Sequence, residues 1–372
     1  MSGASGADET NSLSSTLQLL GPSAGGIRAH VAQLAEGLAD RGVSAPVVGP
    51  AGVMDGIGGQ AGEVSVPGSV RPFELARARR ELHPWRRPAQ LVHAHGLKAA
   101  WCAIGGRPRR PLVLTVHNIV LDEAAGRSAE AQRVLERRVL SRADRVIALT
   151  SQMGRDLGEF VDQARITVAL PASPPPIVGE DRAAVRKRLG IGDNVPMVVS
   201  VARLHPQKDL PTLLTAWEAV HADHPDAVLV IVGDGPQRAE LETLAGTLRV
   251  GPSVVFAGAR PHAVDEIAAA DVAAMTSIWE GAALVLAETT QLGIPMVSTP
   301  TGLAPEVLDG TSGGVIVGFG DPDATAEALC HMLDDPEAAA SMGARGRDRA
   351  RSVFEPGRAI EEIMATYREV IE

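Results

Sequence analysis

Residues 197–220 read MVVSVARLHPQKDLPTLLTAWEAV, and this stretch shows in one place the alternation that runs along the whole chain. The apolar run 197–201 is typical of a strand covered on both faces of a parallel sheet. After a polar loop, apolar side chains return at helical spacing at Leu210, Leu213, Leu214, Trp217 and Val220. Asp209 directly precedes this run and is a plausible N-cap of the helix. Strands that alternate with helices predict a doubly wound α/β sheet with right-handed crossovers.

Twelve short apolar runs predict the strands. They occupy residues 16–20, 43–48, 90–93, 112–116, 145–149 and 166–170, then 197–202, 227–232, 254–257, 272–276, 295–298 and 315–317. Twelve strands exceed what one open twisted sheet normally holds. Residues 171–179 read PASPPPIVG, and four prolines in nine residues suit a semi-rigid linker. We therefore predict two Rossmann-like domains.

The predicted domain boundaries follow from these patterns. Residues 1–15 are rich in Ser, Gly, Ala and acids, and we interpret them as a disordered tail. The two domains span 16–172 and 173–355. Residues 356–372 carry apolar side chains at helical spacing and form a last helix.

The composition excludes several classes of protein. Hydrophobic residues make up 45% and charged residues 22%, as in ordinary globular domains. The formal net charge of −10 argues against a nucleic-acid partner. Cys102 and Cys330 have neither metal-ligand spacing nor a disulfide pattern. With no signal peptide and no apolar run of about 18 residues, we expect a cytoplasmic protein.

Residues 71–110 form a basic region with ten Lys or Arg and two Asp or Glu, and they include Trp85 and Trp101. One interpretation is a solvated basic face. The other is peripheral contact with an anionic membrane that carries a lipid acceptor.

Two loops in the second half carry candidate binding residues. Arg203 and Lys208 follow a strand and precede a helix N-terminus, where two cations suit a diphosphate; the alternative is two solvated loop cations. Gly233 lies in the turn of VGDGP after another strand. A dinucleotide fingerprint fails there because Arg238 replaces its last glycine, which gives a nicotinamide oxidoreductase little support.

Residues 277–288, SIWEGAALVLAE, carry two carboxylates eight positions apart, Glu280 and Glu288. Eight helical residues advance about 12 Å, whereas the carboxyl groups of a retaining glycosidase are about 5 Å apart. Two hydrogen-bond acceptors along an extended ligand fit this spacing better. A surface carboxylate and a capping carboxylate are the alternative.

The first half offers a glycine pair and a histidine. Gly25 and Gly26 stand where the first helix begins, and glycines there allow close approach to a phosphate. His117 follows the fourth predicted strand and is either a ligand contact or a structural histidine. The single Asp-x-Asp, at residues 321–323, precedes a helical run, so we interpret it as a helix cap and expect no metal.

Nine motifs taken in order along the chain resemble glycosyltransferase family 4, over residues 17–371. They are GPSAGGIRAHVAQLAEGLADRG, LVHAHG, LTVHN, RADRVIALTS, VARLHPQKDLPTLLTAW, VLVIVGDGP, VVFAGAR, SIWEGAALVLAE and GIPMVSTPTGLAPEVL. The resemblance implies the GT-B fold, with two Rossmann-like domains facing a cleft and the last helix packed on the first domain. It also implies retaining transfer from a UDP- or GDP-sugar, without a metal or a cofactor.

The resemblance also implies site residues. Transfer would depend on His117, Arg203, Lys208 and Glu280. The donor would further contact Gly25, Gly26, Gly233, Arg260, Ala283, Leu284 and Glu288, with Arg260 at the base and Glu288 at the ribose. Where the family usually has Gly-Phe-Gly or Gly-Leu-Pro, this chain has Gly281-Ala282-Ala283, which leaves the sugar unnamed. The acceptor would be a hydroxyl of a small molecule, glycan or lipid. A nucleotide-sugar epimerase of the same fold and a non-catalytic nucleotide-sugar binder are the alternatives.

Overall fold

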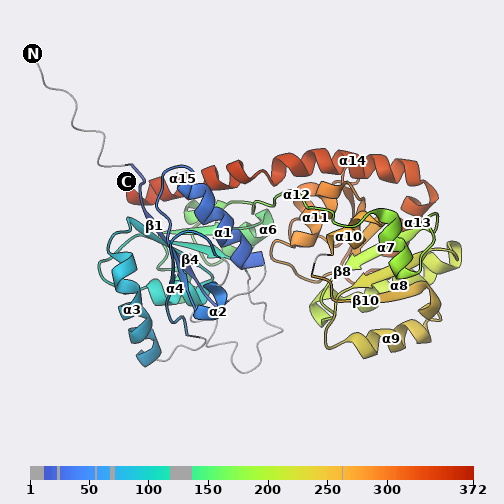
Figure 1. Ribbon diagram of the computed structural model, residues 1–372, viewed down its shortest axis with the longest axis horizontal. Coiled ribbons are helices and arrows are strands. Elements are labelled where there is room, and N and C mark those ends of the chain that lie inside the picture. Colours follow the sequence, from blue (N-terminus) through green and yellow to red (C-terminus); the bar gives the residue numbers. More distant parts are fainter. Residues whose placement is uncertain (1–11, 23–25, 55–56, 68–71, 118–135, 262) are drawn as a thin grey trace, which may run out of the picture. The chain divides into compact units, whose positions relative to one another are not determined.

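The computed structural model describes residues 12–22, 26–54, 57–67, 72–117, 136–261 and 263–372. The chain divides into two compact units (Figure 1). Unit 1 comprises Met1–Ala172 and Glu355–Glu372, and unit 2 comprises Ser173–Phe354. Each unit has its own sheet and its own hydrophobic core.

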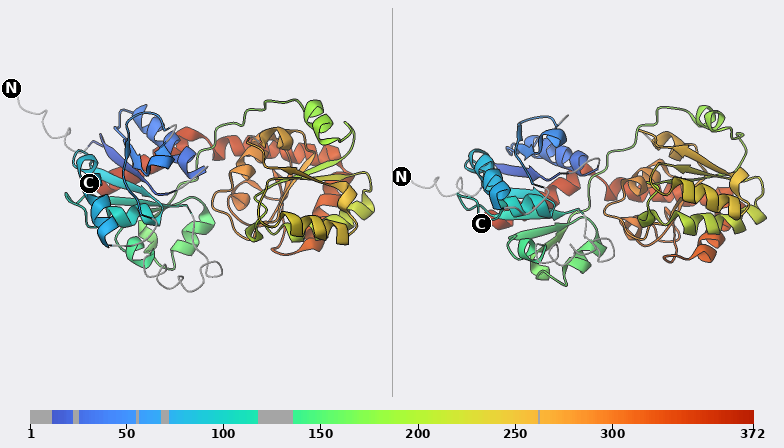
Figure 2. Two further views of the ribbon diagram at one scale, coloured as in Figure 1. Left: turned by 60° about the horizontal axis from the view of Figure 1, so that its bottom comes forward. Right: turned by 90° about the horizontal axis from the view of Figure 1, so that it is seen from below.

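Unit 1 is built on a seven-stranded parallel sheet of order β3-β2-β1-β4-β5-β6-β7, with helices on both faces (Figure 2). Its strands are β1 Thr16–Leu20, β2 Val47–Gly49, β3 Ala61–Glu63, β4 Leu91–His95, β5 Leu112–Val116, β6 Arg145–Ala148 and β7 Ile166–Val168. Its helices include α1 Gly26–Ala39, α2 Ala51–Met54, α3 Pro72–Arg86, α4 Leu97–Ala103, α6 Ser151–Leu157 and α15 Pro356–Ile371.

Unit 2 is built on a six-stranded parallel sheet of order β10-β9-β8-β11-β12-β13. Its strands are β8 Met197–Val201, β9 Val228–Val232, β10 Val254–Gly258, β11 Val272–Met275, β12 Met296–Ser298 and β13 Gly314–Ile316. Its helices include α7 Arg182–Leu189, α8 Leu210–Asp223, α9 Arg238–Thr247, α10 Val264–Ala268, α11 Leu284–Leu292, α12 Ala304–Val307, α13 Pro322–Asp334 and α14 Pro336–Val353. The predicted α/β fold with two doubly wound sheets is confirmed.

Each of the twelve predicted runs overlaps a strand, and among the described residues β3 is the strand that the patterns missed. Its residues Ala61, Gly62 and Glu63 are exposed or half-buried at the sheet edge, so they carry no apolar signal. The cap prediction at Asp321 is correct, since its carboxylate accepts the Ala324 N–H at 2.9 Å.

Helix α15 belongs to unit 1 although it ends the sequence. One of its faces is buried in a hydrophobic cluster with α1 and the sheet, through Ile360, Ile363, Met364 and Tyr367. Leu34 and Leu38 of α1 lie in the same cluster. The helical spacing of these apolar residues thus completes the core of unit 1.

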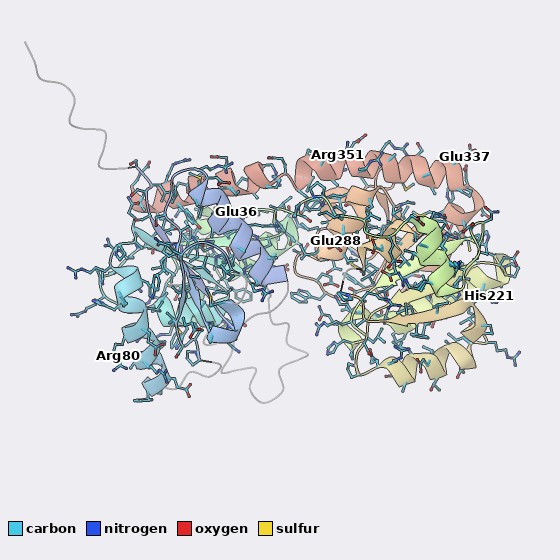
Figure 3. The ribbon with its side chains drawn as sticks, viewed as in Figure 1. Glu36, Arg80, His221, Glu288, Glu337 and Arg351 are labelled. Atoms are coloured by element: carbon cyan, nitrogen blue, oxygen red, sulfur yellow. The ribbon has the colours of Figure 1, made fainter. Side chains whose placement is uncertain are left out.

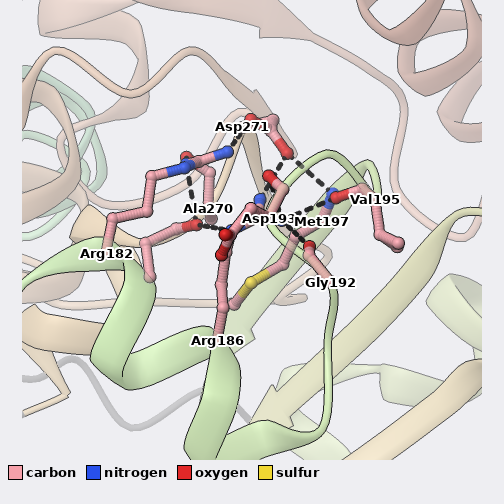
Figure 4. A network of polar contacts seen from close by, with 9 residues as sticks. Arg182, Arg186, Gly192, Asp193, Val195, Met197, Ala270 and Asp271 are labelled. Carbon is pink, nitrogen blue, oxygen red and sulfur yellow. Dashed lines mark hydrogen bonds and ion pairs between the residues drawn. The ribbon is translucent and has the colours of Figure 1, made fainter.

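A buried arginine joins the first strand of unit 2 to its neighbours (Figure 4). The Arg186 guanidinium, on α7, is fully buried and donates to the carbonyl oxygens of Ala269, Gly192 and Val195 at 3.1, 2.9 and 2.7 Å. It also donates to Asp271 Oδ2 at 2.8 Å, and the same oxygen accepts the Met197 N–H at 2.8 Å. Burial lowers the pKa of this guanidinium, against the opposing effect of Asp271. The network fixes the starts of β8 and β11.

We expect Arg186→Met to lower the free energy of unfolding of unit 2 by about 3–5 kcal/mol, because it removes a buried charged donor from the Asp271 carboxylate and from several carbonyl oxygens. Guanidinium unfolding followed through the buried Trp217 measures this loss. Arg182→Met is the matched control. Arg182 contacts Asp271 as well, but its side chain is 42% exposed, so we expect a loss of at most about 1 kcal/mol. Equal losses in the two variants would contradict the prediction.

Candidate functional site

Unit 2 has a topological switch point between β8 and β11. The chain runs outward from β8 through β9 to β10, and the strands β11 to β13 continue on the other side. In open parallel sheets, ligands bind where the loops diverge, at the carboxyl ends of the strands on either side of this point. Here these loops carry Lys208, after β8, and Glu280, after β11.

Lys208 and Glu280 meet at this switch point. The Lys208 ammonium forms an ion pair with Glu280 Oε1, and the two side chains are only 14% and 9% exposed. Ser277 Oγ donates to the same oxygen at 2.6 Å, and the Glu280 N–H donates to Thr301 Oγ1 at 2.8 Å. Within the described residues no donor reaches the other carboxyl oxygen, Oε2. That oxygen is therefore left to accept a hydrogen bond from a ligand.

The two loops are joined by further hydrogen bonds. The Ile278 N–H donates to the Gln207 carbonyl at 2.9 Å, and Gln207 Nε2 donates to the Trp279 carbonyl at 2.7 Å. Thr276 Oγ1 lies 3.2 and 3.0 Å from the carbonyl oxygens of Lys208 and Asp209. These bonds hold the lysine and the glutamate in register before any ligand arrives.

The prediction that Asp209 is the N-cap of α8 is correct for its position but wrong for its side chain, which does not cap the helix. Asp209 stands at the N-cap position but has a φ of 44° and makes no side-chain cap. The second helical residue, Pro211, has no N–H, and the Thr212 N–H donates to the Asp209 carbonyl at 3.2 Å. The Asp209 carboxylate instead accepts the Thr212 hydroxyl at 2.7 Å.

Arg203 lies on the first loop, beside the turn after β9. Its side chain is exposed, and no hydrogen bond or ion pair joins its guanidinium to another described residue. The Leu204 N–H donates to the Asp234 carbonyl at 3.0 Å. Gly233, with a φ of 147°, lies so close that a Cβ atom there would come within 1.8 Å of the Ala202 carbonyl oxygen. The glycine thus allows the two loops to touch where Arg203 projects.

The α11 start presents backbone groups beside Glu280. Ala283 precedes Leu284, the first residue of the helix, with a φ of 54° and no side-chain cap. Gly302 packs over this turn, since a Cβ atom there would lie 3.0 Å from Glu280 Cβ and 3.1 Å from Ala283 Cβ. Uncapped N–H groups at a helix N-terminus favour an anion.

The other two predicted residues of unit 2 lie farther along its elements. Glu288 is half-buried on α11 (Figure 3). Arg260 follows β10, the edge strand, and its Nε lies 3.3 Å from Glu266 Oε1. Glu266 is 1% exposed and also accepts from Arg188 at 3.0 Å. Arg260 is therefore held by a buried carboxylate rather than free in solvent.

In unit 1, Gly25 lies outside the described residues, and Gly26 is the first residue of α1. His117 directly follows β5 and is 6% exposed. Its ring centroid lies 5.6 Å from that of His95 at the end of β4 and 5.5 Å from that of His30 on α1. Burial lowers the pKa of His117 well below its usual value, with His30 and His93 adding to the effect.

Sequence reasoning missed the partners of His117. The alternation in residues 91–96, LVHAHG, puts His93 and His95 on one face of β4, which is a signal that period-2 patterning offers. His30, one helical turn beyond Gly26, was equally available. Within the described ranges, no three or more His, Cys, Asp or Glu side chains are arranged to hold a metal ion.

The basic region of unit 1, residues 71–110, contains both buried and exposed side chains. Arg86 is buried and donates to the carbonyl oxygens of Pro108 and Ala103 at 2.7 and 2.6 Å. Trp85 and Trp101 are half-buried and pack against the core. Phe73, by contrast, is 82% exposed at the start of α3, and Arg80 projects from the same helix into solvent (Figure 3).

Two family models match the chain. Residues 181–349 match "Glycosyl transferases group 1", and residues 25–172 match "Glycosyl transferase 4-like domain". The two matches cover most of both units.

Curated relatives carry related names. A GDP-mannose-dependent alpha-(1-6)-phosphatidylinositol monomannoside mannosyltransferase of Mycolicibacterium smegmatis is 31% identical, over 76% of this chain and 80% of that protein. A GDP-mannose-dependent monoacylated alpha-(1-6)-phosphatidylinositol monomannoside mannosyltransferase of Corynebacterium glutamicum is 37% identical, over 50% of this chain and 49% of that protein. The match thus spans about half the length of the latter. A D-inositol 3-phosphate glycosyltransferase of Kineococcus radiotolerans is 29% identical, over 94% of this chain and 91% of that protein.

Solved structures share the fold. The Anabaena protein HepE in complex with UDP has a TM-score of 0.81 at 22% identity, over 95% of this chain and 100% of that chain. Sucrose-phosphate synthase from Thermosynechococcus elongatus has a TM-score of 0.78 at 22% identity, over 95% of this chain and 98% of that chain.

Proposed function

Because the chain belongs to the glycosyltransferase family that these two models describe, we propose that it transfers a hexosyl group with retention from a nucleotide-diphosphate sugar to an acceptor hydroxyl. The observation that carries the proposal is the Lys208–Glu280 pair at the switch point of unit 2. A cation and a carboxylate oxygen side by side match a ligand that has both a diphosphate and sugar hydroxyls.

GDP-mannose is the donor that we propose first. Two of the relatives above are named GDP-mannose-dependent, and one of them matches over most of its length. Their names also contain phosphatidylinositol mannosides, which supports a lipid-linked or inositol-bearing acceptor. UDP-sugars are the second choice.

In the proposed reaction, the bond between the sugar C1 and the phosphate oxygen breaks while the acceptor oxygen bonds to C1 on the same face. The proton of the acceptor hydroxyl moves to the departing phosphate oxygen. Arg203, Lys208 and the N–H groups at Ala283 and Leu284 would stabilise the negative charge that grows on the diphosphate. These groups supply the positive charge without requiring a metal. Glu280 Oε2 would accept from a sugar hydroxyl.

The remaining site residues would bind the rest of the donor. We propose Glu288 at the ribose, Arg260 at the base and Gly233 beside the diphosphate. Of the residues in unit 1, we propose Gly25 and Gly26 at the diphosphate and His117 at the sugar.

Calorimetric titration of the full chain with GDP, UDP, ADP and GDP-mannose tests the donor, first without metal and then with excess chelator. We expect chelator-resistant binding of one nucleotide, GDP first. A folded chain that binds none of them contradicts the proposal. Incubation of GDP-mannose with candidate acceptors, with the anomer assigned by NMR, then separates retaining transfer from epimerisation and from binding alone.

We further propose that unit 1 contacts an anionic membrane through Phe73 and the exposed arginines of α3. In the described residues, no helix has the length and apolarity to cross a bilayer. Contact would therefore be peripheral, with an apolar side chain inserted among basic ones.

Phe73→Ser is expected to weaken binding to anionic vesicles at low salt about tenfold or more, because it removes the transfer of one aromatic side chain out of water. Co-sedimentation with vesicles of phosphatidylinositol and phosphatidylcholine measures this. Phe319→Ser is the matched control, since Phe319 is 52% exposed but lies in unit 2. Absence of binding by the unaltered chain would contradict the membrane proposal.

A further inference from the structure

A buried chain of hydrogen bonds in unit 1 leads from α15 to His117. Tyr367 Oη lies 2.5 Å from His93 Nδ1 and 3.3 Å from Gln18 Nε2. Gln18 Oε1 lies 3.0 Å from His95 Nε2, and His95 Nδ1 lies 3.4 Å from His117 Nε2. Tyr367 and His95 are at most 2% exposed, and Gln18 is fully buried. These side chains are therefore shielded from bulk solvent.

Gln18 sets the direction of the chain. Its amide nitrogen donates one hydrogen to Thr16 Oγ1 at 2.9 Å and the other to Tyr367 Oη. Both hydrogens are then used, and the amide oxygen can only accept. His95 Nε2 must accordingly carry a hydrogen and donate it to Gln18 Oε1.

The tautomers of the histidines follow from charge. Burial lowers the pKa of His95 well below its usual value, and the neighbouring histidines lower it further, so the ring is neutral near pH 7. A neutral imidazole has one N–H, so His95 Nδ1 is an acceptor. His117 Nε2 faces that acceptor and therefore donates. His117, whose pKa is lowered in the same way, then has no hydrogen on Nδ1.

The rest of the cluster is consistent with this assignment. Tyr367 Oη accepts from Gln18 and donates to His93 Nδ1, which leaves His93 Nε2–H to donate to Thr115 Oγ1 at 2.7 Å. Burial lowers the pKa of His93 to about 3 and that of His30 to about 4. The groups that act electrostatically on His117 are thus neutral imidazoles.

We propose that Gln18, His95 and Tyr367 are positioning residues that hold His117 in its Nε2–H tautomer and leave Nδ1 as a fixed acceptor for a hydroxyl group of the transferred sugar. Among the described residues, Nδ1 has no hydrogen-bond partner. A neutral acceptor there selects a donor hydroxyl and excludes a second acceptor such as a phosphate oxygen. The identity of the ligand rests on the proposed function; the tautomer does not.

The tautomer is tested by histidine nitrogen NMR on the full chain, with the His117 signals assigned by their loss in His117→Gln. We expect a protonated Nε2 and an unprotonated Nδ1. In Gln18→Met, which removes the acceptor of His95, we expect a mixture of tautomers at His117. Gln33→Met, a glutamine of α1 outside the network, is the control.

Kinetics with GDP-mannose test the consequence. We expect Gln18→Met to lower kcat about tenfold, the loss of one oriented hydrogen bond, with nucleotide affinity unchanged because the diphosphate does not contact His117 Nδ1. Equal losses of kcat and of nucleotide affinity in Gln18→Met would indicate a merely structural effect and contradict the positioning role. A protonated Nδ1 at His117 in the unaltered chain overturns the proposal whatever the activity. If His117 has the predicted tautomer but the chain binds no nucleotide sugar, the proposed function and the sugar contact are overturned instead.

Discussion

Lys208→Ala is expected to lower kcat with the nucleotide-sugar donor about 10²- to 10³-fold while the chain stays folded. Removal of one preorganised group that stabilises the charge of a transition state has this effect in other enzymes. The expected loss of kcat is larger than for an exposed cation. Lys208 is only 14% exposed, and charge interactions are less screened at buried positions. Initial rates of nucleotide release, with circular dichroism as the folding check, measure it.

Two further variants make this result interpretable. Lys187→Ala is the matched control, because Lys187 lies exposed on α7 of the same unit and should leave the rate unchanged. Lys208→Ala also leaves Glu280 without its counter-ion, which by itself destabilises the loop. In Lys208→Met/Glu280→Gln the unpaired charge is gone, so we expect stability to recover but not activity. Wild-type turnover in Lys208→Ala would exclude the diphosphate role.

Unit 1 is expected to unfold when the pH is lowered from about 6.5 to 4. Four buried histidines have folded pKa values below the ordinary value of 6.5, about 4 for His30 and about 3 for His93. The unfolded chain therefore binds more protons below pH 6.5, and stability is complete above that pH and declines as the pH falls. At about 1.36 kcal/mol per pH unit for each proton, His30 and His93 alone remove roughly 7 kcal/mol by pH 4.

That loss is comparable to the whole stability of an ordinary domain. Denaturant unfolding at several pH values, followed by the fluorescence of Trp85 and Trp101 in a chain with Trp217 and Trp279 replaced by Phe, reports on unit 1 alone. In His93→Gln, which keeps hydrogen-bonding groups but cannot be protonated, we expect the slope of stability against pH to fall by about 1.4 kcal/mol per unit. A stability of unit 1 that is flat between pH 7 and 4 would contradict the histidine assignment.

The fold was predictable because its signals are local. Each apolar run lies between turn residues, and parallel strands need no alternating pattern to be recognised. The strand β3 escaped because an exposed edge strand of Ala, Gly and Glu has no apolar side chain to mark it. The cap at Asp209 was misjudged because the proline two positions later removes the N–H that the cap would need.

The sequence was enough to predict which loops carry the site residues, but not which of those residues contact one another. Residues that follow parallel strands lie at one edge, so Arg203, Lys208 and Glu280 could be grouped from their positions. The Lys208–Glu280 pair spans 72 residues and depends on left-handed backbone at Asp209 and Ala283, which no pattern indicates. The bond from Gln18 to Tyr367 spans 349 residues, so it could only be found in three dimensions.

The membership of α15 in unit 1 has a consequence for protein synthesis. Unit 2 is continuous and can fold as soon as residue 354 has left the ribosome, whereas unit 1 waits for residues 355–372. Until then, Leu34, Leu38 and Leu91 lack the apolar face that covers them, and His93 lacks Tyr367. Unit 1 is therefore translated first but completes its folding last. A nascent chain stalled before residue 355 would expose apolar surface that chaperones and proteases recognise.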